Sequence, residues 1–143
     1  MHLPPVSLSS HPVEVGARTE AIVVAELIRR GYRVLLPFGT NQRYDLVLDL
    51  DGRFVRVQCK TGRLRDGVVR FRSESIRANS HKVFRRPYTD EIEMFVVYCP
   101  GNERIYAIPI EDVSCGETAL RVDPTANNQQ KFVRWASQYE LPA

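Results

Sequence analysis

Several features of other protein classes are missing from this sequence of 143 residues. It has three cysteines and no Cys-x-x-Cys pair, which argues against both a disulfide framework and a zinc knuckle. No apolar run approaches the roughly 20 residues of a membrane span. The first residues, MHLPPVSLSSHPV, lack the basic start and apolar run of a signal peptide. We therefore expect a cytoplasmic protein with reduced thiols and no membrane association.

A glycine-rich phosphate loop is also missing, so nothing in the sequence supports nucleotide hydrolysis. The histidines His2, His11 and His81 have no metal-binding spacing, and we interpret them as surface residues. The composition, with 43% hydrophobic and 26% charged residues, is ordinary for a globular protein. The length fits one domain. We expect that domain to span residues 13–143, after a flexible N-terminal arm over residues 1–12 that is rich in proline and serine.

The net charge is only +3, but charge is unevenly distributed along the chain. Residues 63–86 carry eight Lys or Arg and two acidic residues, whereas residues 87–126 carry eight acidic residues and two basic ones. Seven of the eight cations in the first block are arginines, which bind phosphate in a bidentate manner. This block favours a nucleic acid partner. A solvated surface without a partner is the alternative.

Hydrophobic periodicity predicts an α+β or a three-layer α/β domain, in which helices flank a sheet. Apolar residues at helical spacing predict a helix over residues 13–30 that ends at Gly31. Residues 74–92 are polar and basic, and we expect them to be irregular or partly helical; a second helix is expected within residues 130–139. The expected strands, in chain order, are residues 44–50, 53–60, 67–73, 94–99, 104–110 and 119–122.

The first two strands flank an Asp-Gly pair, a strong hairpin signal, and the hydrophobic pattern predicts their register. If Leu50 faces Arg53, the apolar residues of both strands share one face, whereas a slip of one residue would mix the two faces. In this register Asp45 lies opposite Gln58, and Lys60 lies two residues further along the same polar face.

This polar face also holds Val47 and Phe54, so we expect it to be partly covered, by the N-terminal helix. A carboxylate, an amide and a lysine in a half-covered cleft have the composition of a Mg²⁺ site for phosphate chemistry. Asp45 is then the ligand that bridges metal and phosphate, and Gln58 lends its side-chain carbonyl. Lys60 orients the attacking water and balances charge in the transition state. The alternative is the solvated outer face of an antiparallel sheet.

Two further ligands are expected near this face. The backbone carbonyl of Cys59 adds an oxygen, while the Cys59 side chain points to the apolar face as a small buried hydrophobe. Glu20 lies on or near the buried side of the predicted helix and supplies the negative charge that one carboxylate and one amide lack. An exposed carboxylate paired with an arginine is the alternative for Glu20.

Three short segments carry these residues: GARTE at 16–20, RYDLV at 43–47 and VQCKTG at 57–62. Together they resemble the PD-(D/E)XK nuclease superfamily, and specifically its group I intron-associated endonuclease branch, in which glutamine takes the second acidic place. The resemblance covers residues 13–110, with a weaker echo near the C-terminus. Arg43-Tyr44 replaces the proline that can precede the aspartate, and the Gln58 amide binds metal less strongly than a carboxylate.

The resemblance implies a restriction-endonuclease-like core, a mixed sheet that contains a three-strand antiparallel meander and is flanked by helices. It also implies a metal-dependent endonuclease that hydrolyses phosphodiester bonds in double-stranded DNA, with Mg²⁺ or Mn²⁺ as cofactor. The active-site residues that it implies are Glu20, Asp45, Gln58 and Lys60. Because cutting both strands takes two active sites, it further implies a homo-oligomer, a dimer or a tetramer.

For such an enzyme we expect DNA backbone contacts from five basic residues, Arg63, Arg65, Lys82, Arg85 and Arg86. Two alternatives keep the same fold. One is a non-catalytic DNA-binding or assembly module, and the other is a Holliday junction resolvase specific for branched DNA.

Overall fold

A computed structural model describes residues 1–78 and 82–143, so His81 lies outside the described residues. Its one long helix in this part of the chain, α1 (Pro12–Arg29), confirms the first predicted helix. The imidazole Nδ1 of His11 accepts a hydrogen bond from the backbone N–H of Val13 at 3.3 Å and so caps the first turn. The helix ends before Gly31, whose φ of 91° lies in the left-handed region that glycine adopts readily.

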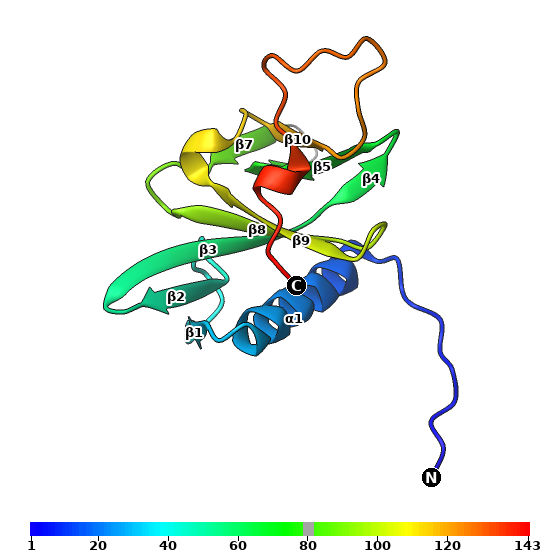
Figure 1. Cartoon of the computed structure of the whole chain (residues 1–143). Coiled ribbons are helices and arrows are strands. Elements are labelled where there is room, and N and C mark those ends of the chain that lie inside the picture. Colours follow the sequence, from blue (N-terminus) through cyan, green and yellow to red (C-terminus); the bar gives the residue numbers. More distant parts are fainter. Residues whose placement is uncertain (79–81) are drawn as a thin grey trace.

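The central sheet has the strand order β1-β2-β3-β8-β9 (Figure 1). Its strands are β1 (Arg33–Leu35), β2 (Leu46–Leu50), β3 (Arg53–Thr61), β8 (Met94–Cys99) and β9 (Arg104–Pro109). β3 and β8 are parallel, and the other neighbours are antiparallel. The predicted α+β fold, a mixed sheet with a three-strand antiparallel meander, is thereby confirmed, although the meander consists of β1, β2 and β3.

The β2–β3 hairpin has the predicted register. Leu46 pairs with Val57 at one end of the ladder, and Leu50 pairs with Arg53 at the other. The turn between them has left-handed φ values, 54° at Asp51 and 91° at Gly52, as a type I′ turn requires.

Helix α1 covers the apolar face of this hairpin, where Val23 and Leu27 are buried against the apolar strand residues. The prediction that α1 covers the polar face is therefore wrong. The physical reason is that the helix has its own apolar stripe, which is stable only against an apolar surface. On the polar face, Tyr88 contacts Lys60, whereas Phe54 near the hairpin turn remains 60% exposed.

The strand predicted over residues 67–73 belongs to a second sheet, with the order β10-β5-β4. This sheet consists of β4 (Arg63–Arg65), β5 (Val68–Arg72) and β10 (Glu117–Arg121). β3 runs into β4 through Gly62, where a Cβ atom would lie 2.7 Å from Val69 Cγ1 and 3.0 Å from Val97 Cγ1. The chain can therefore pass from the first sheet to the second only because this residue has no side chain.

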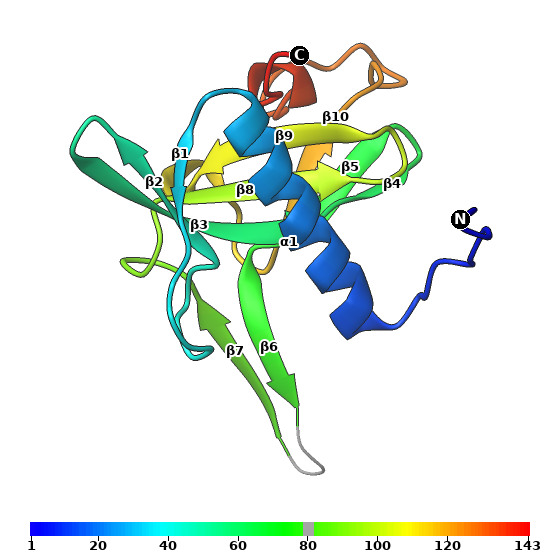
Figure 2. The same ribbon diagram turned by 90° about the horizontal axis from the view of Figure 1, so that it is seen from below.

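The prediction of an irregular or partly helical segment over residues 74–92 is wrong for residues 74–78 and 83–87, whereas residues 88–92 contain no helix or strand. Strands β6 (Glu74–Ala78) and β7 (Val83–Pro87) form an antiparallel hairpin that projects from the body of the molecule (Figure 2). Every residue of β7 is exposed. Because β7 is exposed throughout, burial imposes no alternation of apolar and polar residues on it that the sequence could show.

The second predicted helix, within residues 130–139, is reduced to a single 3₁₀ turn, η2 (Ala136–Gln138). Another 3₁₀ turn, η1 (Ile110–Asp112), follows β9. Among the described residues, no helix combines the length and apolar character that crossing a membrane requires.

Candidate active site

The candidate site lies where β3 extends beyond its partner β2. The ladder between them ends at Leu46 and Val57, and Asp45 stands directly before β2. Asp45 Oδ2 accepts a hydrogen bond from the backbone N–H of Cys59 at 2.8 Å. Since the N–H and C=O of one strand residue point to the same side, the Cys59 carbonyl also faces this open edge.

Gln58 lies beside that carbonyl. Its Nε2 is 3.5 Å from the Cys59 carbonyl oxygen. A half-turn of the amide exchanges its nitrogen and oxygen, which brings a second neutral oxygen next to the carbonyl. Gln58 and the Cys59 carbonyl are therefore together at the edge, as the sequence predicts, whereas the Cys59 thiol is buried beneath α1, and burial raises the pKa of that thiol.

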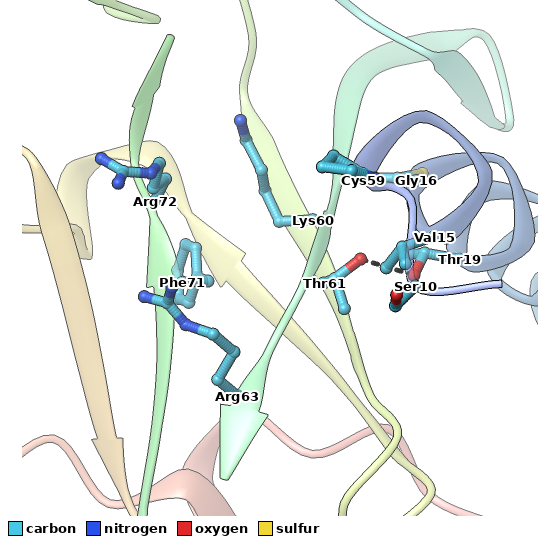
Figure 3. A pocket seen from close by; sticks show the side chains of 11 residues that line it. Ser10, Val15, Gly16, Thr19, Cys59, Lys60, Thr61, Arg63, Phe71 and Arg72 are labelled. Atoms are coloured by element: carbon cyan, nitrogen blue, oxygen red, sulfur yellow. Dashed lines mark hydrogen bonds between the residues drawn. The ribbon is translucent and has the colours of Figure 1, made fainter. Parts of the chain in front are cut away.

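Helix α1 brings Glu20 to the same edge. The neighbouring Thr19 is buried, and its Oγ1 lies 2.6 Å from Oγ1 of Thr61, the residue after Lys60 (Figure 3). Glu20 and Asp45 line one pocket of about 330 Å³. Among the described residues Glu20 makes no ion pair, so the alternative of a surface pair with arginine is not observed.

The two carboxylates influence each other. Burial, followed by the negative charge of Asp45, raises the pKa of Glu20. Burial also raises the pKa of Asp45, against the opposing effects of the Cys59 N–H and the positive charge of Lys60. Both groups are thus less readily ionised than in water, because desolvation disfavours a charged carboxylate.

Lys60 lies on the polar face of β3, two residues beyond Gln58. Its Nζ lies 3.4 Å from Tyr88 Oη and 5.0 Å from the centre of the Tyr88 ring. Burial lowers the pKa of Lys60; Asp45 opposes this shift, and Arg43 and Arg72 add to it. Lys60 lines a second pocket of about 620 Å³, and it is still near enough to Asp45 for the two charges to interact.

The side chain of Arg43, near Lys60, was not predicted as part of the site. The guanidinium of Arg43 lies 3.9 Å from the centre of the Tyr88 ring, forms an ion pair with Glu91, and donates to Ser75 Oγ at 2.7 Å. Arg43 therefore connects the loop before Asp45 to the base of the β6–β7 hairpin. Its partners Ser75 and Glu91 are 32 and 48 residues away in sequence, so no local pattern signals these contacts.

The predicted DNA-binding residues fall into two groups. Arg63 and Arg65 lie on β4 and are exposed, and Arg63 forms an ion pair of 2.6 Å with Glu117 of β10. Arg72 of β5 was not predicted, although it lines the larger pocket together with Lys60 and Arg63.

The other group belongs to the β6–β7 hairpin. Lys82, Arg85 and Arg86 are all exposed, Lys82 just before β7 and the two arginines within it. Arg86 forms an ion pair of 2.7 Å with Glu91, and Arg85 lies 3.9 Å from Glu74. The hairpin and β4 thus carry basic residues on two separate elements.

Comparisons with known proteins agree with this architecture. Protein 5.3 of Escherichia phage T7 is 41% identical over 46 residues, which are 32% of this chain and 39% of the phage protein, so the match spans less than half of that relative. A bacterial homing endonuclease, I-Ssp6803I, has a similar structure, with a TM-score of 0.73 and 23% identity over 92% of this chain and 89% of that one. At this identity the likeness concerns the fold alone.

The family comparison covers almost the whole sequence. Residues 10–142 match the family model described as PD-(D/E)XK endonuclease. This range contains Glu20, Asp45, Gln58 and Lys60, so the resemblance seen in three short segments extends across the fold that positions them. The chain therefore belongs to the PD-(D/E)XK endonuclease family.

Proposed function

We propose that the protein is a metal-dependent endonuclease of the homing or restriction type that hydrolyses phosphodiester bonds in double-stranded DNA. The observation that carries this proposal is the convergence on one open strand edge of Glu20, Asp45, Gln58, Lys60 and the Cys59 carbonyl. They come from α1, from the residue before β2 and from β3. Membership of an endonuclease family supports a nuclease, and the site supplies the chemistry.

The donor set fits a hard divalent cation. Within residues 1–78 and 82–143, no three His, Cys, Asp or Glu side chains are grouped to hold a metal ion, so two carboxylates need neutral oxygens beside them. The Cys59 carbonyl and the Gln58 amide provide such oxygens, and Mg²⁺ in proteins keeps several waters as well. The raised pKa values of Glu20 and Asp45 also fit a cation site, because a cation bound nearby would favour the ionised form that burial disfavours.

We therefore assign Glu20, Asp45, Gln58 and the Cys59 carbonyl as the ligands of Mg²⁺, with Mn²⁺ as a substitute. When bound, such an ion offsets the charge of the scissile phosphate and lowers the pKa of an attacking water. Asp45 accepts the Cys59 N–H through Oδ2, so Oδ1 would be available to such an ion.

Lys60 acts on the water and the phosphate. In hydrolysis the water oxygen forms a bond to phosphorus while an ester oxygen leaves; the water loses a proton and the leaving oxygen gains one. The Lys60 ammonium donates hydrogen bonds to the phosphate oxygens as negative charge accumulates on them. Its lowered pKa also brings proton exchange at Nζ closer to neutral pH.

We propose that Arg63, Arg65, Lys82, Arg85 and Arg86 contact DNA phosphates, so that binding weakens steeply with salt. Because each chain has one such site, cutting both strands requires two chains. We therefore expect a homodimer or homotetramer, and light scattering during size-exclusion chromatography will measure its mass.

Cleavage of a supercoiled plasmid in Mg²⁺ or Mn²⁺ tests the enzyme proposal. The wild type is expected to produce nicked and linear DNA, and Asp45→Asn and Lys60→Ala to lower the rate by about 100-fold or more. Asp49→Asn is the matched control, on β2, which directly follows Asp45. Asp49 accepts a hydrogen bond from the Gly52 N–H, which an amide oxygen can also accept, so this variant should cut at the wild-type rate.

The alternatives give different results. If the wild type binds duplex DNA but is as inert as Asp45→Asn in both metals, the protein is a binding module and the enzyme proposal is wrong. A four-way junction compared with a linear duplex of the same sequence tests the resolvase alternative. Cleavage of the junction alone would replace the proposed substrate with branched DNA.

A further inference from the structure

The register of the second sheet gathers arginines on one face. Paired residues in a ladder point to the same side of a sheet, and residues two apart along a strand share a face. Arg63 pairs with Arg70, Arg72 pairs with Glu117, and Val68 pairs with both Arg65 and Arg121. The charged residues of this face, which we call the arginine face, are Arg63, Arg65, Arg70, Arg72, Arg121 and Glu117.

The opposite face of the same sheet is buried. Val69, Phe71 and Leu120 have at most 1% of their surface exposed and belong to the core that also contains Phe95. The inner face therefore holds the sheet in place. The arginines, of which Arg70 and Arg72 are exposed, are not needed for that packing.

Charge on the arginine face is poorly balanced. Its one acidic residue, Glu117, forms an ion pair with Arg63 at 2.6 Å, although Arg72 is its direct partner in the ladder. Arg65, Arg70 and Arg72 form no ion pair with any described residue. Arginines held close together without acidic partners repel one another and leave their donors available to an anion.

The arginine face begins at the candidate active site. Arg72 and Arg63 line the same 620 Å³ pocket as Lys60, and Figure 3 shows all three side chains around it. Arg72 is also near enough to Lys60 to lower the pKa of its ammonium. The cations therefore continue from Lys60 through Arg72 to the rest of the sheet.

We infer that the arginine face binds the sugar-phosphate backbone of DNA on one side of the cut, with Arg70, Arg72 and Arg121 as phosphate contacts beside Arg63 and Arg65. This inference rests on the proposed function and assigns a path to its substrate. Side chains on one face of a strand repeat every ~6.6 Å, and neighbouring strands are ~4.8 Å apart. The face thus presents a grid of guanidinium groups, which suits a chain of phosphates and reads no bases.

Binding of a fluorescein-labelled 20-bp duplex, measured by anisotropy in EDTA over a range of salt concentrations, tests the inference without cleavage. The variant is Arg70→Gln/Arg72→Gln. The matched control is Arg33→Gln/Arg53→Gln, which removes the same charge from β1 and the start of β3, at the end of the hairpin away from β4. The test variant should weaken binding on the order of tenfold and lower the salt slope by about 1.8, because each phosphate contact contributes about 0.9. The control should have the wild-type slope.

Further outcomes separate this inference from the proposed function. Arg70→Lys/Arg72→Lys keeps the charge and should recover most of the slope, and thermal melts should show that all variants fold. If the wild type binds and cuts DNA but the test and control variants have equal slopes, the arginine face is not the DNA path. If Arg70→Gln/Arg72→Gln changes only the oligomeric state of the protein, the arginine face is likewise not the DNA path. If the wild type neither binds nor cuts any DNA, the proposed function fails and the inference fails with it.

Discussion

Two arginine-rich regions of this molecule are balanced differently. At the base of the β6–β7 hairpin, Arg43 and Arg86 both form ion pairs with Glu91, and nearby Arg56 pairs with Glu93 at 2.9 Å. On the arginine face, five arginines accompany a single glutamate. The same residue type therefore has acidic partners in one region and largely lacks them in the other.

On the proposed function, this difference separates structural charges from functional ones. The Arg43–Glu91 and Arg56–Glu93 pairs join segments far apart in sequence, so they stabilise the position of the hairpin base relative to the central sheet. The unbalanced charges, on the arginine face and in the neighbouring Glu20 and Asp45 pair, are unfavourable in the isolated protein. They become favourable only when a ligand of opposite sign binds, which is a common reason why functional sites reduce stability.

Among the variants that test this difference, Arg43→Met is expected to have the largest effect. Arg43 contacts Glu91, Ser75, the Tyr88 ring and the carbonyls of Arg86 and Pro87, so its loss leaves several half-buried groups without a partner. We expect a loss of about 3 kcal/mol in the free energy of unfolding, measured by urea denaturation. Arg72→Met is the control and should change stability by less than about 0.5 kcal/mol. Equal losses would show that the arginine face is also structural.

A smaller effect, of opposite sign, is expected for Asp45→Asn. The pKa of Asp45 is raised in the folded protein, so this carboxyl favours folding below its unfolded pKa, and that contribution is lost as pH rises through the folded pKa. Asparagine does not ionise, so Asp45→Asn does not lose this stability as pH rises. In the absence of metal, Asp45→Asn should therefore unfold at higher urea concentration than the wild type at pH 7, and the difference should vanish below about pH 4.

The control for this experiment is Asp49→Asn, which should show no gain at pH 7. Addition of Mg²⁺ should stabilise the wild type and leave Asp45→Asn unchanged, because a ligand stabilises only the state that binds it. A variant less stable than the wild type at pH 7 would mean that Asp45 is a structural charge, like those at the hairpin base.

The sequence predicts the parts of this fold that local patterns determine. The Asp51-Gly52 turn and the alternation around it are sufficient for the register of β2 and β3, which in turn positions Asp45 near Cys59. Helical spacing identifies α1 but not the sheet face it covers, because an amphipathic helix fits any apolar surface. The placement of α1 on the apolar face, and hence the approach of Glu20 from that side, needed the structure.

Long-range contacts are what the sequence does not reveal. The block of residues 63–86 has a net positive charge but is divided between β4 and β5 of one sheet and the β6–β7 hairpin, which forms another. Arg72 lines the Lys60 pocket because the chain passes from the first sheet to the second at Gly62. Only glycine fits at this position, since a Cβ atom would lie too close to Val69 and Val97. Charge counting therefore predicts that a basic surface exists, but not which arginines form it.

A smaller effect is expected from the positive charge of Arg72 on the pKa of Lys60. Because Arg72 contributes to the lowered pKa of Lys60, Arg72→Gln should raise that pKa, as measured by NMR titration of the lysine side chain. Lys60 then stays protonated to higher pH. Arg53→Gln should leave the titration unchanged, and 0.5 M salt should shrink the difference, since exposed charges are screened. An unchanged pKa in Arg72→Gln would separate the arginine face from the active site.

The smallest effect is expected for Glu117→Gln, which removes the one acidic residue from the arginine face and leaves Arg63 without its ion pair. An exposed pair of this kind contributes little to folding, so stability should change by less than about 0.5 kcal/mol. DNA affinity should rise roughly twofold to threefold, and the salt slope should increase by up to about 0.9, because Arg63 no longer has to leave Glu117 to reach a phosphate. Asp51→Asn is the control: it removes the same charge at the far hairpin turn, where Asn-Gly supports the same turn type. A gain equal in both variants would reflect net charge alone, whereas a gain confined to Glu117→Gln would show that Glu117 limits how strongly this face attracts DNA.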